Sequence, residues 1–143
     1  METDKKTISP TAFKLGLAGL IPFVVLAGSS FALPSSYKDI ILLVLLAYGA
    51  SISSFLGAIH WGLTMRDENP NGMYLIWGVM PSLIAWISLM LNPDLGLLLI
   101  TALLWVCLII DAKIYPIYGL KHWLPMRLFL TTTASLACLV VSL

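Results

Sequence analysis

Five long apolar segments, almost free of charged residues, occupy most of this 143-residue sequence. A helix needs about 20 mainly apolar residues to cross the hydrocarbon core of a bilayer, and every segment has about that length or more. The sequence therefore predicts an all-α integral membrane protein, a bundle of five transmembrane helices that forms one domain over residues 1–143. The predicted spans are 13–33, 39–65, 73–91, 95–113 and 124–143.

The overall composition agrees with a membrane protein and argues against nucleic-acid binding. Hydrophobic residues make up 59% of the chain and charged residues only 10%, far from the balance of a soluble domain. The net charge is +1, and no face or tail concentrates enough Lys or Arg to neutralise many phosphates. We expect the lipid bilayer, and not nucleic acid, as the surrounding partner.

The basic residues are distributed unevenly between the two ends of the predicted spans. Lys38 alone lies at one end, and seven basic residues lie at the other: Lys5, Lys6, Lys14, Arg66, Lys113, Lys121 and Arg127. Cytoplasmic loops carry an excess of Lys and Arg. The N-terminus is therefore expected in the cytoplasm and the C-terminus on the opposite side.

A competing interpretation treats residues 1–32 as a signal peptide that is cut after Ala32, which would leave four spans. The apolar run is long for such a peptide and contains Pro22. We therefore expect the first span to be retained.

His60 is the most informative residue, because it lies within the second span in the stretch "SSFLGAIHWGLTMRDE". It precedes Arg66 by six residues, which places it ~9 Å inside the cytoplasmic end at the rise of a helix. Gly49, Ser53 and Gly57 form a stripe of small residues on the same helix, a pattern that lets helix backbones approach closely. His60 is thus expected to face the bundle interior, where an ionisable residue suggests a functional site.

Candidate partners of His60 come from the same depth on the fourth and fifth spans. Asp111 is the first choice, Arg127 is the alternative mate of Asp111, and Tyr115 flanks both. A second interpretation has Asp111 and Arg127 extend to the headgroups as rim residues while His60 bonds a backbone or hydroxyl group. This second interpretation is favoured for Arg127 considered alone. For His60, the pairing with Asp111 and the bond to a backbone or hydroxyl group are nearly equally favoured.

Other features limit the chemistry. Pro22 and Pro81 lie within spans and are expected to act as packing kinks. His60 is the only histidine inside a predicted span, and no Cys or His spacing resembles a zinc or iron–sulfur site. Cys107 and Cys138 differ in depth by ~12 Å, too far for a disulfide. No cofactor and no metal are therefore expected.

Several motifs resemble a known family. They are "FLGAIHWGL", "MPSLIAW", "IID" and "HWLPMRLFLT". Together they are similar to the small multi-pass membrane family of unknown function that includes mitochondrial transmembrane protein 69. The resemblance covers about residues 13–143 and implies a multi-pass inner-membrane protein, without an activity, ligand or catalytic residue. The long leader of mitochondrial members is lacking, which favours a bacterial cytoplasmic membrane.

Three classes of function remain open. The preferred one is a scaffold, accessory or assembly subunit, which packs through its small-residue stripes against a larger membrane complex or against itself. The alternative is a small transporter or proton-linked channel that uses the cluster of His60, Asp111 and Arg127. The third is a membrane enzyme that acts on lipid or quinone headgroups, with His60 as base and Arg127 as anion clamp.

Overall fold

The computed structural model describes residues 6–143, and within them the chain is helical and without strands. Lys5, which contributes to the predicted charge bias, lies outside the described residues. The predicted boundaries of all spans agree with the helices to within three residues. The elements are α1 (Pro10–Ala18), α2 (Ile21–Ala32), η1 (Ser35–Tyr37), α3 (Lys38–Thr64), α4 (Gly72–Ser88), α5 (Pro93–Ile114), η2 (Lys121–Trp123) and α6 (Leu124–Ser142).

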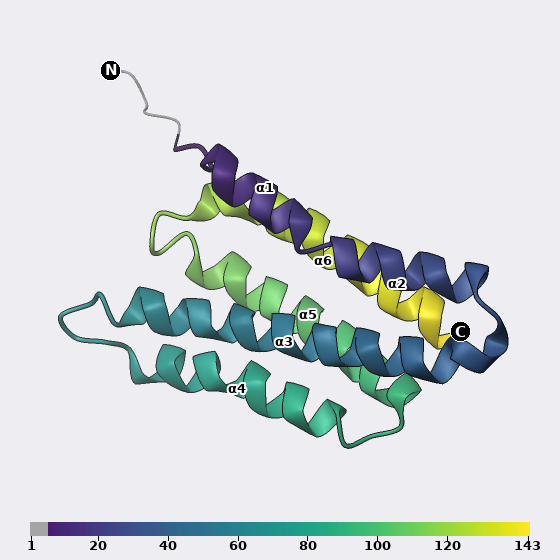
Figure 1. Ribbon diagram of the computed structural model, residues 1–143. Helices are drawn as coiled ribbons and strands as arrows, with labels where there is room; N and C mark the ends of the chain where they lie inside the picture. The colour runs from purple at the N-terminus through teal and green to yellow at the C-terminus, as the bar shows by residue number, and fades with distance from the viewer. Residues whose placement is uncertain (1–5) are drawn as a thin grey trace.

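The α1–α2 segment and the helices α3, α4, α5 and α6 run alternately in opposite directions, so the start of α1 and the end of α6 lie at opposite ends of the bundle (Figure 1). The central helix is α3, which packs against α2, α4, α5 and α6. The α1–α2 segment lies along α6, whereas α4 covers α3 on another side (Figure 1). The loops after α3 and α5 are at the same end of the bundle as α1.

Within residues 6–143, four helical segments are long and apolar enough to span a membrane, fewer than the five predicted. The exception is α4, whose 17 residues extend only ~26 Å. It ends at Ser88 because Leu89, Met90 and Leu91 form a turn, with backbone hydrogen bonds to residues three positions earlier. Because these three residues are apolar, the sequence predicts that the span continues to residue 91.

The first span is broken into two helices instead of being kinked. Pro22 cannot donate a backbone hydrogen bond, and α1 ends at Ala18 while α2 begins at Ile21. The Tyr48 hydroxyl of α3 donates to the carbonyl oxygen of Gly19 at 2.9 Å, so a side chain satisfies a backbone group at the break. No residue of α1 is fully buried, which shows that this helix lies on the outside of the bundle.

The small-residue stripe of α3 packs against two different helices. A methyl group on Gly57 would overlap the carbonyl oxygen of Gly78 in α4, and one on Gly49 would lie 2.8 Å from Ile100 of α5. Ser53, between them, is fully buried and donates to the carbonyl of Gly49 at 2.9 Å. The stripe therefore sets the spacing of α3 from α4 and α5.

Candidate functional site

The polar site lies where the C-terminal parts of α3 and α5 meet the N-terminal part of α6, at the α1 end of the bundle (Figure 1). His60 is on α3, Asp111 on α5 and Arg127 on α6. Each lies within about one turn of its helix end, so the antiparallel arrangement brings the three side chains to one depth.

His60 is paired with Asp111. The distance between His60 Nε2 and Asp111 Oδ1 is 2.8 Å, and the two residues are only 2% and 1% exposed. The other ring nitrogen, Nδ1, is buried and has no hydrogen-bond partner among the described residues.

Arg127 forms an ion pair with the second oxygen of the Asp111 carboxylate. Its Nε donates to Asp111 Oδ2 at 2.7 Å, and its Nη2 lies 2.7 Å from the same oxygen without forming a hydrogen bond of its own. The residue is 7% exposed. The expectation that Arg127 extends to the rim is therefore wrong: the burial of a guanidinium is costly, and the facing carboxylate compensates its charge.

The cluster of His60, Asp111 and Arg127 connects three helices through one carboxylate. The charges of Asp111 and Arg127 cancel, so the net charge of the cluster is that of His60 alone. Removal of the carboxylate would leave a buried cation without a counter-charge, which is strongly destabilising. Among residues 6–143, no group of three or more His, Cys, Asp or Glu side chains could hold a metal ion.

The two tyrosines near the cluster have different surroundings. Tyr115 is buried, and its ring centroid lies 6.1 Å from that of His60. Tyr118 lies in the loop after α5, and its hydroxyl donates to Asp67 Oδ2 in the loop after α3 at 2.6 Å. This hydrogen bond raises the pKa of Tyr118, because the proton is held by the carboxylate.

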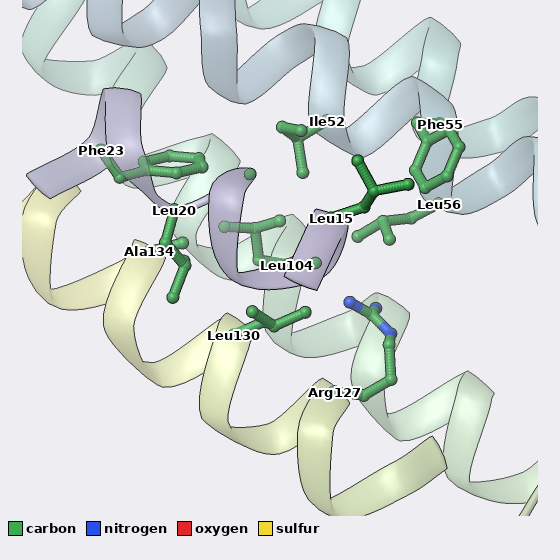
Figure 2. Close-up of a pocket in the computed structure, with 12 residues that line it drawn as sticks. Leu15, Leu20, Phe23, Ile52, Phe55, Leu56, Leu104, Arg127, Leu130 and Ala134 are labelled. Carbon is green, nitrogen blue, oxygen red and sulfur yellow. The ribbon is translucent and has the colours of Figure 1, made fainter. Parts of the chain in front are cut away.

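A groove adjoins the cluster between α1, α3 and α6. Its outer part has a volume of about 470 Å³ and extends to Leu120 and Trp123, and its inner part of about 170 Å³ reaches Phe23 and Ala134. Among the residues that the structure describes, Arg127 is the only charged one that lines either part. Figure 2 shows its guanidinium directed between the surrounding leucines. The residues shared by both parts are Leu15, Gly16, Phe55, Leu56, Arg127 and Leu130.

Residues 8–143 match the family described as Protein of unknown function (DUF3429). The chain belongs to this family. It is 33% identical over 137 residues to Transmembrane protein 69 of Xenopus tropicalis, a match that covers 92% of this chain and 53% of that protein. It is 24% identical over 135 residues to Transmembrane protein 69 of Mus musculus, with 92% and 55% covered. The chain thus spans about half the length of these curated relatives. No solved structure matches it.

The resemblance predicted from the sequence is thereby confirmed, and the chain is a member of a membrane protein family. Sequence reasoning missed two features of this family member. The first is the groove, which depends on how α1 lies over α3 and α6. The second is a pair of fully buried polar residues, Thr64 and Ser135. Their helical spacing from His60 and Arg127, four and eight residues, was the only signal in the sequence that could have found them.

Proposed function

We propose that the protein crosses its membrane five times, with the α1 end of the bundle at the cytoplasmic face and the C-terminus on the other side. The distribution of charge supports this orientation. Lys38 is at the other end, and the basic residues described at the α1 end are Lys6, Lys14, Arg66, Lys113, Lys121 and Arg127. A helix as short as α4 is accommodated by local thinning of the bilayer. The expected location is a bacterial cytoplasmic membrane.

For function, we propose that the groove binds an amphipathic membrane ligand that has an apolar chain and a head with oxygen acceptors. The observation that carries this proposal is that a long apolar groove is lined by one buried guanidinium. Along α6 the groove runs from Trp123 to Ala134, ~16 Å at helical rise. Apolar pockets with a few fixed polar groups are typical of ligand sites. The apolar walls would hold the chain, and Arg127 with Tyr115 would face the head.

The arrangement favours binding over catalysis. His60 does not line either part of the groove, and its Nε2 is engaged by Asp111. A general base must come within hydrogen-bond reach of the proton that it removes. In this proposal His60 and Asp111 therefore hold Arg127 in position, and Arg127 contacts the ligand.

A scaffold function was favoured by the small-residue stripe of α3, and this stripe is not free to contact a partner. Gly57 and Gly49 pack inside the bundle, against α4 and α5, so the stripe is not offered to a partner. A transporter would need a route that opens to both faces. The groove lies on one side of the cluster, with its wider part toward the α1 end. Ligand binding is the function that this geometry supports best.

Native mass spectrometry of the protein, extracted from membranes in mild detergent, tests the proposal. Leu130→Trp would fill the groove, whereas Leu128→Trp adds the same side chain to an exposed position on the same helix. We expect an amphiphile of defined mass on the unchanged protein and on Leu128→Trp, with at least a several-fold loss on Leu130→Trp. Equal retention of lipid by both variants would overturn the proposal.

A further inference from the structure

The side chains that line the groove are apolar with three exceptions, Arg127, Tyr115 and Trp123. Arg127 and Tyr115 are only 7% and 3% exposed, so the packing of the bundle holds both of them in place. A guanidinium and an indole can donate hydrogen bonds and cannot accept them. Among the residues that the structure describes, no carboxylate, side-chain amide, serine or threonine lines either part of the groove. The groove therefore offers mainly hydrogen-bond donors to a ligand.

The hydroxyl of Tyr115 can donate or accept, and its neighbour decides between these two roles. It lies beside the guanidinium of Arg127, within reach of a hydrogen bond. Because a guanidinium cannot accept, the hydroxyl turns its oxygen toward Arg127, and its hydrogen is left for another acceptor. Both residues line the outer part of the groove. They thus present donors side by side to whatever occupies that part.

The charge of Arg127 is already compensated within the protein. Its Nε donates to Asp111 Oδ2 at 2.7 Å, and its Nη2 lies 2.7 Å from the same oxygen. Nη1, on the other side of the planar guanidinium, is the nitrogen that this contact leaves for a ligand. An anionic head would approach the buried carboxylate of Asp111 without a free cation to balance it, because no lysine lines the described groove. Burial of an unpaired charge is costly, so the groove disfavours a charged head.

We propose that the groove selects an uncharged amphiphile whose head carries carbonyl oxygens and no hydrogen-bond donor. This inference rests on the proposed function of the groove as a ligand site, and it names the class of ligand. A carbonyl oxygen has two lone pairs and accepts from Arg127 Nη1 and the Tyr115 hydroxyl together. A hydroxyl or ammonium group on the ligand would bring a donor into a pocket that lacks a side-chain acceptor for it, and an unpaired buried donor is costly. Acyl esters and membrane quinones both have heads of the required kind.

Binding of matched amphiphiles, measured by native mass spectrometry in mild detergent, tests this proposal. Methyl palmitate, palmitate, hexadecanol and hexadecylamine share an alkyl chain and differ in the head. Leu130→Trp, in which the groove is filled, gives the background for each probe. We expect methyl palmitate to bind in the groove about ten-fold more tightly than the other three, because it alone leaves no charge or donor unpaired.

The same measurement separates this inference from the proposed function. Equal binding of all four probes, lost in Leu130→Trp, would overturn the inference and support the groove as a ligand site of another specificity. Tighter binding of palmitate than of its methyl ester would also overturn the inference. If no probe bound more tightly to the unchanged protein than to Leu130→Trp, both proposals would be wrong.

Tyr115→Phe tests the donor directly, because it keeps the ring and removes the hydroxyl. We expect it to weaken the binding of methyl palmitate several-fold and to leave the binding of hexadecane, which has no head, unchanged. Tyr37→Phe is the matched control, since Tyr37 lies in η1 at the opposite end of the bundle. Unchanged binding of the ester to Tyr115→Phe would contradict this role. Should Tyr115→Phe fail to fold, the comparison of probes on the unchanged protein still decides the inference.

The amphiphile that the unchanged protein carries from its membrane distinguishes the two sources of a carbonyl head. A quinone has an ultraviolet absorbance that reduction with borohydride removes, whereas an acyl ester lacks it and releases a fatty acid in alkali. Either result, with the amphiphile lost from Leu130→Trp, supports the inference. A bound amphiphile with a phosphate, carboxylate or amine in its head would overturn it.

Discussion

Gly57 of α3 lies directly against the carbonyl oxygen of Gly78 in α4, and the Cα of neither glycine has room for a methyl group. A methyl on Gly78 would overlap the ring of Trp61, whose Nε1 donates to the carbonyl of Leu75 at 2.8 Å. Close backbone approach of this kind is how membrane helices associate without a hydrophobic driving force. The contact holds α4 to the bundle although that helix is short.

Gly57→Ala should therefore destabilise the protein by about 1–3 kcal/mol, because the added methyl forces α3 and α4 apart. Gly62→Ala is the matched control, since nothing lies within 4 Å of a methyl group there. Alanine favours a helix over glycine by roughly 0.5–1 kcal/mol, so the control should be neutral or slightly stabilising. Thermal unfolding in detergent measures both, and equal effects would show that the Gly57 contact is not tight.

The orientation can be tested with single cysteines at Ser36 in η1 and at Pro70 in the loop between α3 and α4, which lie at opposite ends of the bundle. Cys107 and Cys138 are buried and should give little background. We expect an impermeant thiol reagent to label Ser36→Cys in intact cells and Pro70→Cys only after permeabilisation. Labelling in the reverse order would invert the proposed topology, and labelling of both in intact cells would show that the loops share one face.

The span positions could be predicted from the sequence because apolar length and charged loops follow from the bilayer itself. The pairing of His60 with Asp111 is predicted from depth in the membrane and from the sign of the charge, and the structure has this contact at 2.8 Å. Depth says nothing about rotation around a helix axis. For that reason the sequence could not show that Arg127 faces inward and donates a hydrogen bond to the second carboxylate oxygen of Asp111.

The break in the first span and the groove could not be predicted for a related reason. Pro22 indicated a weak point, but whether the helix kinks or separates depends on partners such as Tyr48, which bonds Gly19 at the break. The groove requires α1 to lie across α3 and α6 at a particular angle. That angle is a property of the packed bundle and not of any one segment.

The hydrogen bond from Tyr118 to Asp67 predicts a dependence of stability on pH at the loop end. It raises the pKa of Tyr118 above its ordinary value of 10.0, so the folded chain holds this proton more tightly than the unfolded chain. Its contribution is present at neutral pH and is lost as the pH rises through the folded-state pKa. The melting-temperature difference between the unchanged protein and Tyr118→Phe should shrink toward zero over that range. A difference that stays constant or grows would contradict the bond.

The buried cluster predicts an unequal effect of its members. Asp111→Asn should cost about 3–5 kcal/mol, because it leaves the charge of Arg127 buried and uncompensated. His60→Ala should cost less, since Asp111 keeps its ion pair with Arg127. Chemical unfolding in detergent ranks the two variants, and a larger loss for His60→Ala would contradict this order.

A double-mutant cycle between His60 and Asp111 tests most directly the claim that the three side chains act as one unit. The unfolding free energies of His60→Ala, Asp111→Asn and the double variant are compared with that of the unchanged protein. We expect the double variant to lose about 0.5–3 kcal/mol less than the sum of the single losses, the range found for residues in contact. Losses that simply add would contradict the cluster, because they would mean that His60 and Asp111 stabilise the bundle independently.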